Sequence, residues 1–163
     1  MIKEIFSDQM KKWFKNKEIK LNKPYPDIEL FHLKSNNIRN ISDLCPSDGR
    51  ALVINFGSCS WPPFVLAYKD YIEIVKKYSK KADFITVYIK EAHPKEGWNF
   101  GEEVHGSFFI NSPKDFEEKK KLALNFAREA DPNEITEFYL DGMDDSACLK
   151  YGAHPERLFA IKN

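Results

Sequence analysis

Residues 51–64 read ALVINFGSCSWPPF, and this stretch decides the fold. Its first half is a nearly continuous apolar run, which is typical of a central strand covered on both faces. Pro62 and Pro63 fit only the first turn of a helix, where the backbone N–H groups lack partners in any case. The residues between, with Cys59 and Trp61, therefore form a tight turn from a buried strand into a helix. Such turns hold redox nucleophiles, yet this one carries an indole at its tip.

Strand and helix patterns alternate outward from this turn. Residues 62–79 are expected to form a helix, because their large apolar side chains recur at helical spacing. A second helix is expected within residues 112–129, capped by Ser112 and with Pro113 at its first position. Residues 36–44 are expected to form a turn and one helical turn. Strands are expected within residues 23–33, 50–56, 82–89, 134–141 and 156–161.

This order of elements predicts one α/β domain over residues 21–163, with a mixed central sheet flanked by helices. A strand–turn–helix unit with a cysteine in the turn, together with this order of elements, predicts a thioredoxin-like fold. The chain stops soon after the strand RLFAI, so we expect a fold that is truncated at its C-terminal end. A bare strand edge there favours self-association into a homodimer.

The first 20 residues place Ile2, Ile5, Phe6, Met10 and Trp13 at helical spacing, opposite a face rich in lysine. They predict an amphipathic helix. Two interpretations are open: the apolar face packs on the domain or a partner, or the helix lies on a membrane surface. We favour packing, because this is the usual role of an amphipathic helix.

The composition excludes several classes of protein. The 25 basic residues balance the 25 acidic ones, and no basic patch indicates nucleic-acid binding. Three irregularly spaced cysteines and four scattered histidines match neither a disulfide framework nor a metal site. No apolar run reaches the length of a membrane span, and no signal peptide pattern is present. We therefore expect a cytoplasmic protein without a tightly bound cofactor.

The sequence resembles the iodothyronine deiodinase family at three ordered motifs. Residues 55–64, NFGSCSWPPF, match the family's Asn-Phe-Gly-Ser-Cys-Thr-selenocysteine-Pro-Pro-Phe except at Ser60 and Trp61. Residues 83–98, DFITVYIKEAHPKEGW, and residues 141–161, DGMDDSACLKYGAHPERLFAI, are similar to two further family motifs. The resemblance implies a thioredoxin-like fold with an insertion, which agrees with the order of elements.

The resemblance implies that a selenolate at position 61 attacks iodine on an aromatic ring and is then regenerated by thiols. A chalcogen there would sit at a helix N-terminus, where the helix dipole stabilises an anion and lowers the pKa of a thiol. Cys59 matches a family cysteine that helps in regeneration. An external thiol of the thioredoxin or glutathione type would supply the electrons. The alternative for Cys59 is a small buried apolar residue.

Trp61 cannot act as the nucleophile, because indole offers only a weak N–H donor. Three explanations are open. The codon is UGA, read as selenocysteine in the cell and written as Trp; or Trp is genuine and the protein is a degenerate binding version; or the residue is a deliberate substitution.

The resemblance implies roles for further residues. His93 would contact or protonate the phenol, and Glu91 would orient His93 or transfer protons. Glu91 is the second acid of the family's Glu-Glu-Ala-His, whose first acid is replaced here by Lys90. Four more residues match family positions expected to bind the substrate: Ser58, Tyr88, Glu156 and Arg157. For Arg157 we prefer another interpretation, in which an ion pair holds its strand in place.

Departures from the family pattern weaken thyroid hormone as the natural substrate. A second family histidine is replaced by Pro113, and the Gly-rich segment beyond the last strand is absent. The sequence therefore predicts a deiodinase-like redox enzyme acting on an iodothyronine-like halogenated phenol or on peroxide. Two alternatives remain: a thiol peroxidase or disulfide reductase based on Cys59, and a catalytically dead binding domain if Trp61 is genuine.

Overall fold

The computed structural model describes residues 18–97 and 108–162. The order of its elements agrees with the alternation expected from the sequence around residues 51–64. The helices and strands are β1 (Glu29–His32), β2 (Ile38–Asn40), α2 (Ile41–Leu44), β3 (Ala51–Gly57), α3 (Pro62–Tyr78), β4 (Ala82–Tyr88), α4 (Phe116–Ala130), β5 (Glu137–Leu140), α5 (Ser146–Tyr151) and β6 (Arg157–Ile161).

The strands form one six-stranded sheet in the order β2-β1-β5-β4-β3-β6. Its centre is parallel, since β4 pairs in parallel with both β3 and β5. The outer strands are antiparallel: β1 pairs with β5 and β2, and β6 pairs with β3. The predicted mixed sheet is therefore confirmed. Within the described ranges, no strand pairs with the outer edge of β6.

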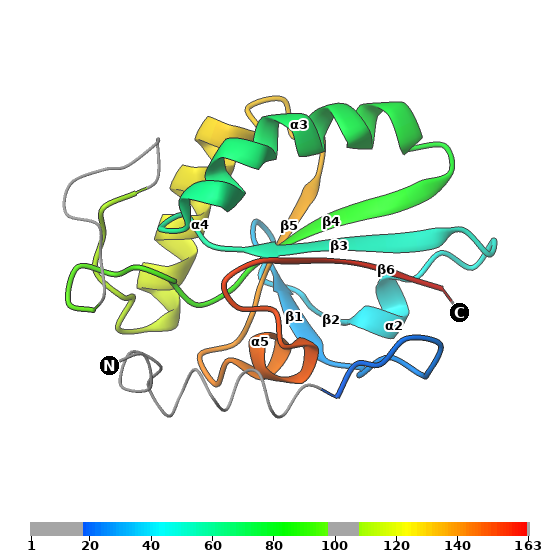
Figure 1. The fold of residues 1–163 in the computed structure, drawn as a ribbon, viewed down its shortest axis with the longest axis horizontal. Helices are drawn as coiled ribbons and strands as arrows, with labels where there is room; N and C mark the ends of the chain where they lie inside the picture. Colours follow the sequence, from blue (N-terminus) through cyan, green and yellow to red (C-terminus); the bar gives the residue numbers. More distant parts are fainter. Residues whose placement is uncertain (1–17, 98–107, 163) are drawn as a thin grey trace, which may run out of the picture.

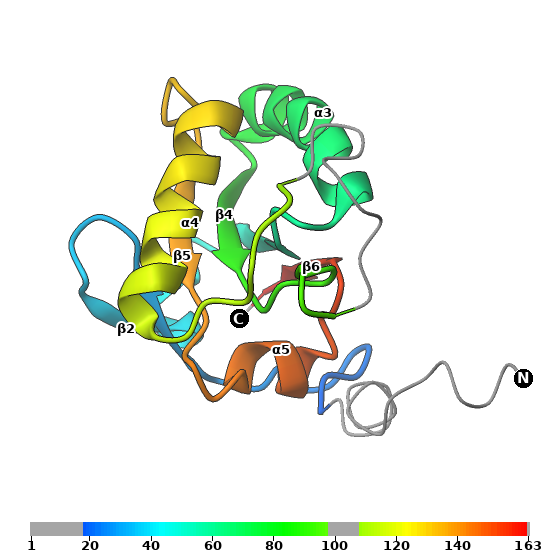
Figure 2. The ribbon, with the colours of Figure 1, turned by 90° about the vertical axis from the view of Figure 1, so that its left-hand side faces the viewer.

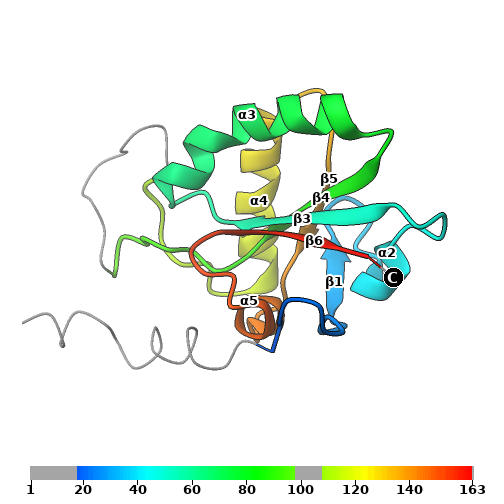
Figure 3. The ribbon, with the colours of Figure 1, turned by 45° about the vertical axis from the view of Figure 1, so that its right-hand side comes forward.

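Helices cover both faces of this sheet (Figures 1 and 3). On one face α3 and α4 enclose an aromatic core in which the rings of Tyr68 and Phe126 lie 5.1 Å apart. On the opposite face α2 and α5 enclose a mostly aliphatic core, in which the ring centroids of Phe56 and Tyr151 lie 5.2 Å apart. Figure 2 shows α4 running along β4 and β5, with α5 beneath them. Burial on both faces explains why β3 is apolar almost throughout.

The structure corrects the start of the helix predicted within residues 112–129. The cap is Asp115, whose carboxylate accepts the Glu118 N–H at 2.9 Å, and α4 begins at Phe116. Ser112 was therefore the wrong cap. Both residue types cap helices, and the Asp115 carboxylate also carries a charge that complements the helix dipole.

Two short elements were not predicted from the sequence. The segment expected as a turn contains β2, which pairs with β1, and α5 lies within residues assigned only by resemblance. Asp141 holds the start of α5, since its carboxylate accepts the N–H groups of Ala147 and Cys148, both at 2.9 Å. Sequence periodicity is weak over so few residues.

The predicted N-terminal helix lies almost entirely outside the described residues. The first residues that the structure describes lie against α5, because the N–H groups of Glu18 and Ile19 both donate to the carbonyl of Lys150. In the part of the chain that is described, no helix is long and apolar enough to cross a membrane.

Candidate active site at the start of α3

The turn between β3 and α3 lies at the carboxyl ends of the parallel strands, where open α/β sheets bind ligands (Figure 1). The turn closes with a hydrogen bond from the Trp61 N–H to the Ser58 carbonyl at 3.3 Å. Gly57 makes the close packing of this turn feasible. A Cβ atom at residue 57 would lie 2.2 Å from the ring of Phe64, the first large apolar residue of α3.

Trp61 is the N-cap residue of α3, with φ −102° and ψ 104°. Its carbonyl accepts the Val65 N–H at 3.2 Å, so its main chain belongs to the first helical turn. Its indole stacks on the imidazole of His93, with the ring centroids 5.2 Å apart and the planes 30° from parallel. The indole Nε1 is buried and has no partner that meets hydrogen-bond geometry. Position 61 therefore combines a helix N-terminus with a neighbouring imidazole.

Cys59 is fully buried and forms part of a polar cluster under the turn. Its Sγ lies 2.9 Å from the Tyr88 hydroxyl and donates to Glu91 Oε1 at 3.6 Å. Burial, and then the negative charge of Glu91, raises the pKa of the Cys59 thiol well above its usual range. Cys59 is therefore held as a thiol, away from solvent.

Glu91 ties the loop after β4 to the turn. Its Oε2 accepts the Ser60 N–H at 2.9 Å, while its Oε1 accepts the Tyr88 hydroxyl. In return, Ser60 Oγ accepts the N–H groups of Ala92 at 3.0 Å and His93 at 3.1 Å. These bonds hold position 61 and His93 in one rigid arrangement. Ser60 was not among the predicted site residues, although it stands at a Thr position of the family motif and keeps the hydroxyl.

Ser58 and Tyr88 both lie at the base of the turn. Tyr88 ends β4 directly opposite Gly57 of β3, and burial raises the pKa of its hydroxyl well above the usual range. Ser58 is buried, and its Oγ has no hydrogen-bond partner. Tyr88 reaches the turn through its hydroxyl, which contacts Cys59 and Glu91. The substrate-binding role that the motif implies for Ser58 and Tyr88 stays a prediction.

Glu156 and Arg157, at the start of β6, lie in different surroundings. Glu156 is partly buried beside the turn: burial raises its pKa, and the nearby Trp61 indole partly opposes this rise. Arg157 is exposed, and it lines a separate hollow with Tyr25 and Phe159. Among the ion pairs of residues 18–97 and 108–162, neither residue takes part, so the predicted ion pair of Arg157 is not present.

His154 belongs to the same region and was missed by the sequence reasoning. It is buried and precedes Pro155 through a cis peptide bond, next to the start of β6. Burial lowers its pKa to about 4, helped by the positive charges of Lys90 and His93. A lone histidine in a loop carries no spacing signal, so only the pairing of β6 with β3 brings it to the turn.

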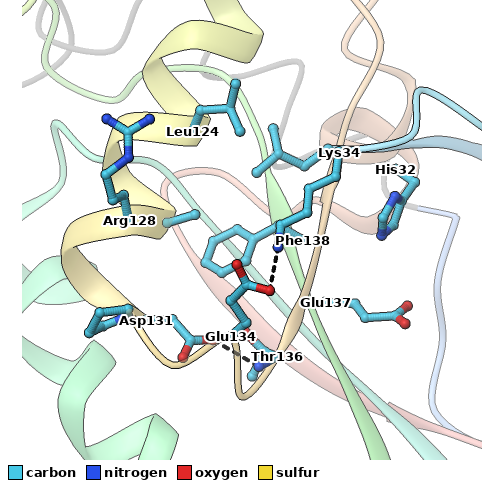
Figure 4. Close-up of a pocket in the computed structure, with 12 residues that line it drawn as sticks. His32, Lys34, Leu124, Arg128, Asp131, Glu134, Thr136, Glu137 and Phe138 are labelled. Atoms are coloured by element: carbon cyan, nitrogen blue, oxygen red, sulfur yellow. Dashed lines mark hydrogen bonds and ion pairs between the residues drawn. The ribbon is translucent and has the colours of Figure 1, made fainter.

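A cavity of about 580 Å³ lies elsewhere, between α4, β1 and β5 (Figure 4). Lys34 and Glu134 form an ion pair of 2.5 Å across it. Glu137 begins β5, so the cavity lies at the opposite end of the parallel strands from the turn. Its lining includes none of the predicted site residues.

The cysteines and acidic groups offer no metal centre among the described residues. Cys45, Cys59 and Cys148 are all free thiols. Burial raises the pKa of Cys148 to about 12, so this third thiol is protonated as well. The candidate site combines one residue at a helix N-terminus, two imidazoles and two carboxyl groups.

Solved structures with the same fold include a thiol-disulfide oxidoreductase from Bacteroides fragilis NCTC 9343, with a TM-score of 0.57 at 12% identity, covering 86% of this chain and 83% of that one. A hypothetical protein from Sinorhizobium meliloti 1021 has a TM-score of 0.56 at 18% identity, covering 88% and 66%. These similarities show the thioredoxin-like fold, as predicted.

Comparison of the sequence with known proteins identifies its family. Thyroxine 5-deiodinase of Gallus gallus is 31% identical over 162 residues, which are 99% of this chain and 59% of that protein. The Sparus aurata protein of the same name is 31% identical over 147 residues, 90% of this chain and 52% of that protein. The chain thus spans about half the length of the curated relatives it matches. A family profile described as iodothyronine deiodinase matches residues 1–163, and the chain therefore belongs to the iodothyronine deiodinase family.

Proposed function

We propose that this domain serves reductive dehalogenation of an iodinated phenol, with the reacting atom at position 61. The observation that carries the proposal is the placement of residue 61 as the N-cap of α3, stacked against His93. A selenolate or thiolate at this place would gain stabilisation from the dipole of a 17-residue helix. Pro62 and Pro63 have no N–H groups, so in the first turn this stabilisation comes from the Phe64 N–H and the helix dipole.

Two thiols supply the two electrons that the proposed reaction consumes. The chalcogenolate attacks iodine, the carbon–iodine bond breaks, and the ring carbon takes a proton, for which His93 is the nearest imidazole. A first thiol then displaces iodide from the chalcogen and forms a mixed Se–S or S–S bond. A second thiol cleaves that bond, releases a disulfide and restores the chalcogenolate. The carbon–iodine bond is reduced to carbon–hydrogen while two thiols are oxidised.

The reductant is an external thiol, and Cys59 is a candidate for one of the two thiols. Its Sγ contacts Glu91 and Tyr88, so a carboxylate stands ready to take its proton when the sulfur attacks. Cys59 is two residues from position 61 in the same turn. Its thiol contacts both Tyr88 and Glu91 of the polar cluster under the turn.

Two observations weigh against Cys59 as the first nucleophile. Its side chain is 0% exposed, and its pKa is raised, whereas an attacking thiol must be accessible and ionised. The thiol peroxidase alternative is thus disfavoured. The binding-domain alternative depends on residue 61 alone, because a genuine Trp leaves the site without an accessible nucleophile.

The test compares variants that differ only at position 61. We expect Trp61→Cys, and more strongly a selenocysteine version, to release iodide from an iodinated phenol in the presence of dithiothreitol. The matched control is Trp61→Ser, which has a similar shape but no attacking sulfur. Iodide release at the same rate from the Cys, selenocysteine and Ser versions would refute the proposal. Turnover of peroxide without iodide release would reassign the enzyme as a peroxidase. A UGG codon at position 61 would support the binding domain.

A further inference from the structure

The hollow that Arg157 lines has a volume of about 440 Å³ and lies between β6, Tyr151 of α5 and the chain segment 19–25. Three aromatic side chains line it, and all three pack on the core under α5: Tyr25, Tyr151 and Phe159. The rings of Tyr151 and Phe159 lie 5.4 Å apart, and the Tyr151 hydroxyl donates to the Pro26 carbonyl at 2.7 Å. The apolar floor of the hollow is therefore held in place before any ligand binds.

The charged residues around this hollow all have the same sign. Four basic residues and no acidic residue are among the described residues that line it: Lys20, Lys23, Arg157 and Lys162. This lining departs from the composition of the chain, in which 25 basic residues balance 25 acidic ones. Asp27, the next acidic residue after Lys23, is engaged elsewhere, since its carboxylate accepts the Ser42 N–H at 2.9 Å and the Ser42 hydroxyl at 2.7 Å. The positive charges therefore reinforce one another at the hollow.

None of these four cations is neutralised within the part of the chain that the structure describes. The ion pairs found in residues 18–97 and 108–162 involve other lysines and Arg50. A group of unpaired cations beside an apolar floor is complementary to a ligand that joins an apolar body to an acid group.

A tight turn presents two of the lysines and an exposed apolar side chain. The Lys23 N–H donates to the Lys20 carbonyl at 3.3 Å, and Asn22 takes the left-handed conformation that such a turn requires, with φ 57°. The turn brings Lys20 and Lys23 close together at the rim of the hollow. Leu21 lies between them and is 90% exposed. A ligand that covers this side chain removes apolar surface from water, which favours binding.

We propose that this hollow binds an amphipathic organic anion, which is a small molecule with an apolar ring or chain and one sulfonate, carboxylate or phosphate group. The apolar body lies on the aromatic floor, and the acid group lies among the cations of the rim. The volume is within the range of small-molecule sites, about 300–1,000 Å³. Neither Trp61 nor His93 lines the hollow, so this site is separate from the turn before α3 and does not depend on the proposed function.

The test is a titration of the full chain followed by the amide signals in NMR spectra. The probe is 1-naphthalenesulfonate, and its control is the uncharged 1-naphthalenesulfonamide, which has the same ring. We expect the sulfonate to bind with a Kd on the order of 1 mM or tighter, and to shift the signals of residues 19–25 and 157–162. The sulfonamide should bind at least ~3-fold more weakly. Added salt should weaken binding of the sulfonate only, because it screens exposed charges.

Matched variants locate the site. Lys20→Gln combined with Lys23→Gln should weaken sulfonate binding by about 3- to 10-fold. Lys69→Gln combined with Lys121→Gln removes the same charge from α3 and α4, on the opposite face of the sheet, and should leave the Kd unchanged. Leu21→Ser should weaken binding by about 2- to 5-fold. All five side chains are exposed, so these substitutions leave the fold intact.

Several results would overturn the inference: equal affinity for the sulfonate and the sulfonamide, equal losses in the two lysine pairs, or signal shifts confined to the turn before α3. An anionic lipid also joins an apolar body to an acid group, so sedimentation with phosphatidylcholine vesicles, with and without phosphatidylserine, separates the two sources. Sedimentation that depends on phosphatidylserine and on Lys20 and Lys23, without binding of the soluble sulfonate, would replace the small-molecule site with a membrane contact. Binding of the sulfonate with the expected order of variants would support the site whether or not the protein dehalogenates phenols.

Discussion

Removal of the Glu91 carboxylate is the most informative perturbation of the site. Glu91 is 3% exposed and accepts from Ser60 N–H, Tyr88 and Cys59. In Glu91→Ala the Ser60 N–H loses its acceptor completely. The Tyr88 hydroxyl and the Cys59 Sγ keep their mutual hydrogen bond of 2.9 Å. One orphaned buried N–H, two weakened bonds and a small cavity predict a loss of about 2–4 kcal/mol in the free energy of unfolding.

The matched control is Glu91→Gln, which keeps an acceptor for Ser60 and adds donors that Tyr88 and Cys59 can accept. We expect a loss of about 1 kcal/mol for this variant. Urea unfolding followed by far-ultraviolet circular dichroism measures both changes, provided the m-values agree. A double-mutant cycle with Tyr88→Phe should give a coupling of at least ~0.5 kcal/mol with Glu91→Ala. A loss below about 1 kcal/mol in Glu91→Ala, or zero coupling, would refute this account of the cluster.

Three further predictions follow from the same structure. Gly57→Ala should cost about 1–3 kcal/mol in thermal unfolding, because its Cβ would lie 2.2 Å from the Phe64 ring, and Phe64→Ala should make the substitution less harmful. The Cys59 thiol should react with iodoacetamide at pH 8 far more slowly than Cys45, as peptide mapping would show, since it is buried with a raised pKa; urea should abolish the difference. Burial raises the pKa of Asp141 from 3.8 to about 6. The protonated acid therefore contributes stability that is fully present below about pH 4 and is lost as pH rises through about 6, on the order of 3 kcal/mol. Urea unfolding of Asp141→Asn should lack this part of the pH dependence.

The parts of the fold that could be predicted are those that a few neighbouring residues determine. The apolar run before Gly57 and the two prolines after Trp61 fix a buried strand and a helix start on either side of the turn, and the structure has β3 and α3 there. The choice between Ser112 and Asp115 as a cap was not predictable, because both residue types cap helices and only the path of the chain selects one.

The site was predictable only where a motif carried it. Cys59, Tyr88 and Glu91 were identified by resemblance, and the structure brings them into contact. The bond between Ser60 and His93 joins residues 33 positions apart, and no local pattern announces such a contact. His154 reaches the turn only through the antiparallel register of β6 on β3, a tertiary feature that sequence periodicity does not contain.

The exchange of hydrogen bonds between Ser60 and the loop after β4 has a mechanical consequence. The turn gives the Ser60 N–H to Glu91, and the loop gives the N–H groups of Ala92 and His93 to the Ser60 hydroxyl. Neither segment can move without carrying the other, so no hinge lies between position 61 and the imidazole beside it. A ligand that contacts residue 61 and His93 would therefore meet two side chains whose main chains are fixed relative to each other.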